Sequence, residues 1–166
     1  VGNAAIRAGN LRAAYDVIVF PDQQPAAILN GYRQGAMPEE FTGGVERSGV
    51  EALREFAEAG GKLVFLNDST GFAVEHLGVK ARNTLRGVSN RDFYCPGSLL
   101  NVKLEAGHPL GYGLPVEFTI WHESSPAFEL DDASARAVLR YSAAPVLASG
   151  WLLGERYLFN RAAVVE

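Results

Sequence analysis

Ser69 stands at a position where many α/β enzymes hold a nucleophile. It belongs to the segment Asn67-Asp-Ser-Thr-Gly71, which follows an apolar run (62–66) and precedes an apolar helical pattern (72–77) that ends at Gly78. The spacing matches the nucleophile elbow G-x-S-x-G, except that Asn67 replaces the first glycine. At such an elbow the backbone N–H groups of the helix N-terminus offer an oxyanion hole. The sequence therefore makes Ser69 a candidate nucleophile.

A serine needs an aligned base before it can attack a carbonyl carbon. The candidate bases are His108 and His122, with Glu123 as the orienting acid, and the turn at 42–44 offers a second oxyanion donor. A different interpretation needs no catalysis: Asp68, Ser69 and Thr70 are favoured capping residues for the helix that follows. In that case no histidine comes within about 3.5 Å of Ser69 Oγ.

A small-molecule site is the second chemical hypothesis. Open α/β sheets bind ligands at the carboxyl ends of their strands, where aromatic side chains often line the cleft. The candidate ligand-binding residues are Gly43, Gly44, Asn67, Asp68, Ser69 and Trp121. The histidines have simpler explanations: His108 precedes Pro109 and suits a turn, and His122 suits a half-exposed strand end. The three histidines and one cysteine show no metal-ligand spacing, so we expect no metal and no cofactor.

The elements that would position these residues begin with two apolar runs, 16–20 and 62–66. Both are rich in β-branched residues, which is typical of strands buried on both faces of a parallel sheet. Between them, an apolar face with helical spacing predicts a helix over 46–59 that ends at Gly60-Gly61. This β-loop-α-β order predicts parallel strands joined by a right-handed crossover.

The second half of the chain predicts short strands. Leu100, Val102 and Leu104 alternate with polar neighbours, as in a strand with one solvated face. The expected strands are 88–95, 98–105, 117–122, 137–142, 146–153 and 156–165. The predicted fold class is therefore α/β: one domain over 1–166, a three-layer sandwich with a mostly parallel sheet, helices on both faces, and antiparallel strands in the C-terminal half.

Composition excludes several classes of function. The chain has 166 residues and a formal net charge of −4 with scattered arginines, so we expect no nucleic-acid partner. Its apolar runs are shorter than the roughly 20 residues of a membrane span. The single cysteine, Cys95, excludes an internal disulfide. Val1 is not a natural start, so we expect an excised piece of a larger protein.

Five motifs suggest a family. They are YDVIVFPD (15–22), TGG (42–44), GGKLVFL (60–66), HPLGYG (108–113) and SGWLLG (149–154). Together they resemble the class I glutamine amidotransferase-like fold, and more narrowly the domain that follows the catalytic domain in bacterial zinc carboxypeptidase-like proteins. The resemblance covers nearly the whole chain. It implies a flavodoxin-like sandwich that here lacks the family's first strand and helix and its closing strand.

The resemblance also bears on catalysis. In amidotransferases the elbow reads G-x-C-x-G, so Ser69 stands in place of the catalytic cysteine, and the family's late His-x-Glu pair is missing. A thiol is partly ionised near neutral pH, whereas a serine hydroxyl is not. We therefore expect no glutaminase activity and no enzymatic activity of this domain itself, but a non-catalytic accessory or ligand-binding role. The alternative is a serine hydrolase that uses Ser69 with His108 or His122.

The same resemblance implies partners and location. The zinc ligands of the peptidase would lie on another domain of the parent protein, which we expect to be periplasmic or secreted. The domain's partner would be that peptidase domain. Missing strands would leave sheet edges open, so a homodimer formed through 1–6 and 157–165 is a further expectation.

Overall fold

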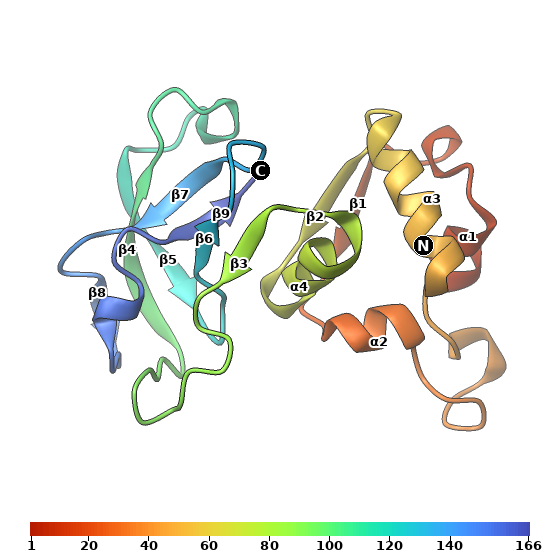
Figure 1. Ribbon diagram of the computed structural model, residues 1–166, viewed down its shortest axis with the longest axis horizontal. Helices are drawn as coiled ribbons and strands as arrows, with labels where there is room; N and C mark the ends of the chain where they lie inside the picture. Colours follow the sequence, from red (N-terminus) through yellow and green to blue (C-terminus); the bar gives the residue numbers. More distant parts are fainter. The chain divides into compact units, whose positions relative to one another are not determined.

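The computed structural model describes residues 1–166, apart from the side chain of Glu40. The chain divides into two compact units, Val1–Val79 and Lys80–Glu166 (Figure 1). Each unit has its own hydrophobic core. Whether the two units act as the single domain expected from the sequence stays a prediction.

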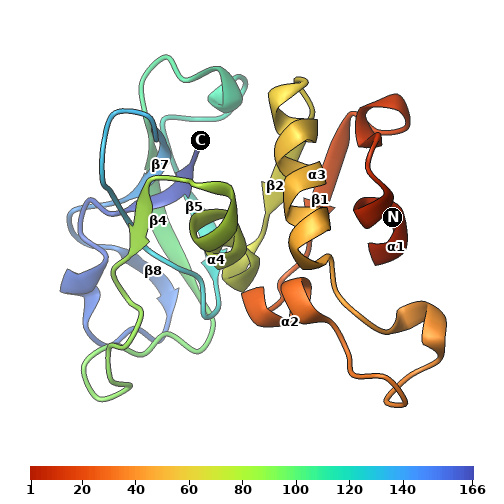
Figure 2. The ribbon, with the colours of Figure 1, turned by 45° about the vertical axis from the view of Figure 1, so that its right-hand side comes forward.

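The first unit is a helical layer on a small sheet. Its helices are α1 (Asn3–Ala8), α2 (Pro25–Asn30), α3 (Glu46–Glu58) and α4 (Thr70–Phe72), and its strands are β1 (Val17–Phe20) and β2 (Lys62–Phe65). Short 3₁₀ turns cover Leu11–Ala13, Glu39–Phe41 and Asn67–Ser69, and one π-helical turn covers Ala73–Leu77. Helix α3 packs against α1 and against β2 (Figure 2).

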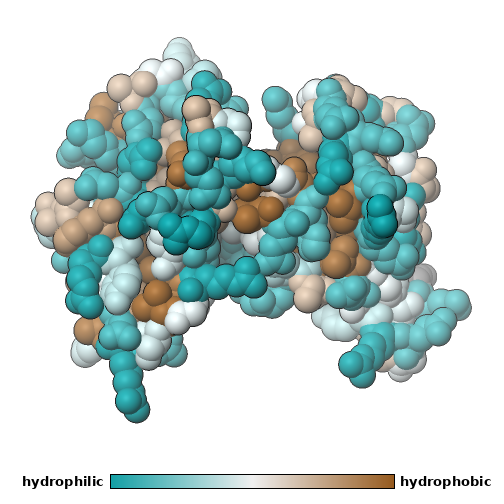
Figure 3. Space-filling model, viewed as in Figure 1, coloured by the Kyte–Doolittle hydropathy of each residue, from teal (hydrophilic) through white to brown (hydrophobic). Residues whose placement is uncertain are grey.

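Strands β1 and β2 pair in parallel, with Val17 opposite Lys62 and Phe20 opposite Phe65. This confirms the predicted parallel pairing and the helix between the two strands. One face of β1 is buried through Ile18 and Phe20, but Val17 and Val19 on the other face are 51% and 55% exposed. The expectation that β1 is buried on both faces is therefore wrong. Apolar side chains reach the molecular surface on the face drawn in Figure 3.

The end of α3 shows why the predicted stop lies at two glycines. Gly60 has φ +86° and donates its N–H to the carbonyl of Ala57, while Gly61 donates to the carbonyl of Phe56. These two bonds form a Schellman motif, which requires a left-handed residue just after the helix. The chain then enters β2 at once, so the glycine pair sets where β2 begins.

Two chain segments meet without intervening side chains beside α2. A Cβ atom on Gly44 would lie 2.2 Å from the carbonyl oxygen of Leu29, and one on Gly31 would lie 1.9 Å from the carbonyl oxygen of Gly43. Val45 N–H also donates to the carbonyl of Ile28 across the same junction, at 2.9 Å. The turn at 42–44 is thus held backbone to backbone against the end of α2.

The second unit is an antiparallel sheet. Its strands are β3 (Ala81–Asn83), β4 (Ser98–Leu104), β5 (Glu117–His122), β6 (Phe128–Leu130), β7 (Ala137–Tyr141), β8 (Leu147–Gly150) and β9 (Ala162–Val165). In the part of the chain that the structure describes, six of these seven strands run in the order β3-β6-β9-β7-β4-β5, and the seventh, β8, pairs with β4 (Figure 1). The core beneath the sheet is formed by Leu100, Val102, Leu139, Tyr141, Val146 and Leu158.

The predicted fold class is wrong. The structure is not a mostly parallel three-layer sandwich: parallel pairing is confined to β1 and β2, and the larger sheet is antiparallel. The physical reason lies in the pattern of the later strands. They alternate apolar and polar residues and are joined by turns rather than crossover helices, which suits an antiparallel sheet with one solvated face.

Some of the strands predicted for the second unit are present in the structure and others are not. Strands β4, β5, β7, β8 and β9 lie within the ranges predicted for them. The predicted strand at 88–95 is instead a series of turns, in which Tyr94 alone forms a bridge, to Leu153. Strands β3 and β6 were not predicted, because three residues are too few to show an alternation. Among the described residues, no helix is long and apolar enough to cross a membrane.

Replacing Gly44 by Ala tests the backbone junction. The new Cβ would lie within 2.6 Å of three backbone atoms of Leu29 and Asn30, so the two segments must separate. We expect unfolding free energy to fall by about 2 kcal/mol or more, measured by urea denaturation, because overpacking strains both segments. Gly2→Ala is the matched control, since nothing lies within 4 Å of its Cβ position. Equal stability of the two variants would contradict the close approach.

Candidate functional site

The elbow after β2 lies where two parallel strands end. Strand β1 runs into Pro21 and Asp22, and β2 runs into Leu66, so both carboxyl ends lie at one edge of the small sheet. Stacked rings attach the elbow helix to this sheet: the Phe20 and Phe65 centroids are 4.6 Å apart, and Phe72 lies 6.0 Å from Phe20. This is the position at which open α/β sheets bind ligands.

Polar side chains at this edge bond one another. Asn67 has φ +49°, a left-handed conformation that asparagine tolerates better than most residues. Asp22 accepts hydrogen bonds from the Asn67 side-chain amide at 3.3 Å and from the Asp68 N–H at 3.1 Å, and Gln24 donates to the Asp68 carboxylate. Burial raises the pKa of Asp68, and the nearby charge of Asp22 raises it further. The hydrogen-bond donors of this network therefore hold the turn in place.

The Ser69 hydroxyl lies inside this turn and is 0% exposed. Its oxygen accepts the N–H of Leu66 at 2.8 Å and lies 2.7 Å from the carbonyl oxygen of Leu66 and 3.2 Å from that of Phe20, so its single proton is donated to a backbone carbonyl. A carbonyl cannot take the proton as a general base does. Ser69 thus ties the end of β2 to the end of β1. Thr70 donates its hydroxyl to the carbonyl of Asn67, which completes the turn.

Gly43 and Gly44 lie away from the elbow. The elbow approaches the first residue of α2, where a Cβ on Gly71 would lie 2.8 Å from Pro25, whereas Gly44 contacts the other end of α2. The Gly43 N–H already donates to the carbonyl of Tyr32 at 2.9 Å, and the Gly43 carbonyl accepts from Asn3 at 2.8 Å. The turn is therefore built as a packing junction, and the Gly43 N–H is occupied rather than available as an oxyanion donor.

The two candidate bases belong to the second unit. His108 Nδ1 accepts the N–H of Leu110 at 3.3 Å, and its Nε2 lies 3.2 Å from a Glu166 carboxylate oxygen. It therefore anchors its turn. His122 is 0% exposed, and its ring lies 5.9 Å from Tyr141 and 6.2 Å from Phe93, centroid to centroid. The expectation of a half-exposed His122 is wrong, because this position of β5 faces the core.

Burial lowers the pKa of His122, and nearby backbone groups of His122 and Ser125 offset part of that effect. Neither ring nitrogen has a well-formed hydrogen bond to the described residues. The ring is therefore a neutral core group beside aromatic neighbours. Cys95 lies in the same core, with its sulfur 3.9 Å from the His122 carbonyl oxygen, and burial is the main cause that raises its pKa.

Trp121, the neighbour of His122 on β5, points the opposite way. It is 61% exposed, and its indole N–H donates to Glu123 at 3.3 Å. A Cβ on Gly97 would lie 2.9 Å from the indole ring, so the ring rests directly on the Gly97 backbone. Of the predicted ligand-binding residues, Trp121 is the one on an open surface of the second unit.

A groove of about 720 Å³ lies on the sheet of the second unit. Residues of β4, β5 and β7 form its floor, and 142–145 and Asn160 form one side. The sequence did not identify this groove, because its residues come from segments that are far apart in the chain. The alternation of Glu117, Thr119 and Trp121 in β5 was the available signal.

The described part of the chain holds no group of three or more His, Cys, Asp or Glu side chains that could bind a metal ion. No model of a known protein family matches this chain, and no curated protein matches it.

Replacing Ser69 by Ala tests the structural role of the hydroxyl. The substitution removes the buried hydroxyl, whereas the Leu66 N–H and the two carbonyls keep their backbone hydrogen bonds. We expect the free energy of unfolding to fall by about 1 kcal/mol or more in urea denaturation, because the hydrogen bonds of the hydroxyl are lost. Ser48→Ala is the matched control, because Ser48 is exposed on α3 and its change should stay within about 0.5 kcal/mol. An unchanged free energy of unfolding in the Ser69→Ala variant would contradict this structural role of the hydroxyl.

His122 predicts a dependence of stability on pH. Its folded-state pKa is below 6.5, so as the pH falls below about 6.5 the unfolded chain binds a proton that the folded chain excludes. The contribution of His122 therefore leaves the free energy of unfolding unchanged above that pH. Below it, the free energy of unfolding falls toward acid pH, by at most about 1.4 kcal/mol per pH unit. Urea denaturation between about pH 7.5 and 5.5 should show a smaller loss in His122→Leu than in the natural chain. Identical pH slopes would contradict this assignment. The raised pKa of Asp68 acts in the opposite sense and at lower pH.

Proposed function

We propose that this chain is a non-catalytic, ligand-binding accessory module of a zinc carboxypeptidase-like protein. The observation that carries the non-catalytic part is the Ser69 hydroxyl, which is fully buried and bonded to the backbone of Phe20 and Leu66. A nucleophile must reach its substrate, and its proton must pass to a base. Ser69 meets neither requirement.

The remaining candidate catalytic groups support the same proposal. His108 holds its turn through Leu110, and His122 lies in a core among aromatic rings. The Gly43 N–H, expected as a second oxyanion donor, bonds Tyr32. Each group that a serine hydrolase would need has a structural role, so the alternative use of Ser69 with His108 or His122 has no support from the geometry.

Attachment to a peptidase is supported by the motifs at 15–22, 42–44, 60–66, 108–113 and 149–154. The module's partner would be the peptidase domain of the full-length parent, which would hold the zinc and lie in the periplasm or outside the cell. A homodimer also stays a prediction, but β9 is paired on both sides, by β6 and β7. The expectation that 157–165 forms an open sheet edge is therefore wrong where β9 is concerned.

A fluorophosphonate probe tests the non-catalytic assignment. Such probes form a covalent bond with activated serines, and we expect none on this chain after incubation, as judged by intact mass. A serine hydrolase labelled in the same experiment is the positive control. One probe molecule per chain, absent from the Ser69→Ala variant, would show that Ser69 is reactive and would overturn the proposal.

A further inference from the structure

The floor of the groove is one face of the sheet, and the strand register shows which side chains lie on that face. Residues opposite each other in antiparallel strands point to the same face. On β4 and β5, Leu99 is opposite Trp121, Asn101 opposite Thr119, and Lys103 opposite Glu117. The opposite face carries the buried Leu100 and Val102. The groove and the exposed Trp121 therefore lie along a single face of the sheet.

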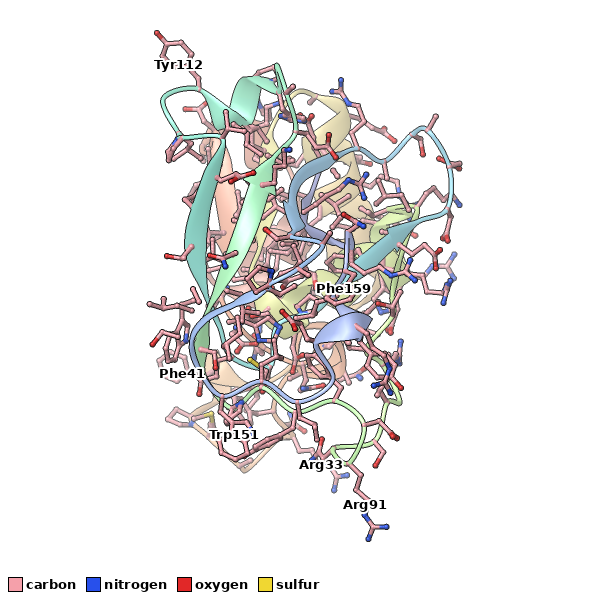
Figure 4. The ribbon with its side chains drawn as sticks, turned by 90° about the vertical axis from the view of Figure 1, so that its left-hand side faces the viewer. Arg33, Phe41, Arg91, Tyr112, Trp151 and Phe159 are labelled. Atoms are coloured by element: carbon pink, nitrogen blue, oxygen red, sulfur yellow. The ribbon has the colours of Figure 1, made fainter. Side chains whose placement is uncertain are left out.

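This face is extended and open. From Leu99 to Glu105 the chain covers about 20 Å at the usual rise of a strand. The groove volume of about 720 Å³ lies within the range of small-molecule sites. Tyr112 projects from the loop at one end of the β4–β5 pair, and Trp151 lies toward the other end (Figure 4). Such a surface suits a chain of several linked units rather than one compact molecule.

The lining of the groove combines apolar and polar residues, and its charges are paired. Lys103 lies 4.0 Å from Glu117, and Arg140 is in contact with Glu105 and donates to the carbonyl of Asn160 at 3.0 Å. Two cations and two anions leave no excess charge to select an anionic or cationic ligand. The floor therefore favours a neutral ligand.

Hydrogen-bonding groups remain available on this floor. In the part of the chain that the structure describes, the Thr119 hydroxyl has no hydrogen-bond partner, and Thr119 is exposed. The Asn101 amide nitrogen donates to the carbonyl of Pro145 at 3.0 Å, which orients the amide oxygen as a fixed acceptor. A ligand with many hydroxyl groups can donate to and accept from such groups.

Trp121 adds a flat apolar platform beside these polar groups. Its ring rests on Gly97 and its N–H bonds Glu123, so its orientation is set before a ligand arrives. The ring face carries negative partial charge and attracts polarised C–H groups. A pyranose ring has a C–H face for the indole and hydroxyl groups at its rim for Asn101 and Thr119.

We propose that this groove and the neighbouring surface of Trp121 together bind a neutral oligosaccharide, with one sugar ring stacked on Trp121 and the following units lying in the groove over Asn101 and Thr119. The proposal rests on the proposed function, because it names the ligand of a non-catalytic module. A peptide that added a strand would pair with the edge of β5, the last strand in the sheet order, and would not lie on this face, so peptide binding is a separate outcome of the test.

The test is binding of the full chain to an array of neutral glycans, acidic glycans and peptides, followed by titration calorimetry with the best neutral oligosaccharide. We expect a neutral glycan to bind and Trp121→Ala to weaken that binding at least about tenfold, since such anchors dominate binding sites. Thr119→Val should weaken it about threefold, as the loss of one hydrogen bond does. Tyr112→Ala is the matched control, because Tyr112 is 96% exposed but lies in the loop after Pro109–Gly111 rather than on the face of β4 and β5.

The proposal is overturned if no neutral glycan binds, if acidic glycans or peptides bind in preference, or if Trp121→Ala binds as tightly as the natural chain. Circular dichroism and thermal unfolding must show that each variant is folded. Thr119→Val changes an exposed residue and should leave the chain folded, so its binding can be compared directly with that of the natural chain. Failure here leaves the fluorophosphonate result unchanged, so the ligand assignment and the non-catalytic assignment are tested separately.

Discussion

The two-residue period of β4 is the constraint on which the second unit depends. Leu100 and Val102 point into the core and are fully buried, while Leu99, Asn101 and Lys103 point to the other face. Strand β4 is also paired with β5 on one side and with β7 and β8 on the other. A shift of register by one residue would place the polar side chains in the core, so the core and the groove are specified together.

The same period separates two neighbours in β5 that have different chemistry. Trp121 faces solvent and its ring rests on the backbone of Gly97, whereas His122 is enclosed among aromatic rings. In the first unit, buried polar groups likewise serve the fold. The Ser69 hydroxyl adds a side-chain link between the ends of two parallel strands that are already paired, and there the Leu66 N–H also donates to the Phe20 carbonyl at 3.1 Å. An elbow of this kind can hold a nucleophile, but here the hydroxyl is a second hydrogen-bond partner for backbone groups of Leu66 and Phe20 that also bond one another and the Ser69 N–H.

Local features of the fold could be predicted from the sequence. The period of α3, the glycine pair at its end and the alternation in β4 and β5 all depend on neighbouring residues. The sheet architecture could not be predicted, because two apolar strands indicate a parallel pair but do not show how far the parallel sheet extends. Val17 and Val19 illustrate the limit: β-branched residues predicted a doubly buried strand, yet both are exposed.

The candidate site shows a similar division. Trp121 was identifiable as an aromatic residue near a strand end, whereas Thr119, Asn101 and Arg140 become neighbours only through strand pairing. The burial of Ser69 was equally hidden, since a spacing of residues does not reveal whether a hydroxyl faces solvent or the backbone. Pairing register and burial are tertiary properties, and both determine which of the predicted residues can meet a ligand.

We propose that ligands bind this chain on the face of β4 and β5 and not at the elbow after β2. Amide chemical shifts of the ¹⁵N-labelled chain, recorded during titration with a neutral oligosaccharide, test it most directly. We expect the largest changes at the Trp121 indole N–H, the Asn101 side-chain amide and the Thr119 backbone. Changes concentrated at Asn67, Asp68 and Ser69, with the groove unaffected, would contradict it.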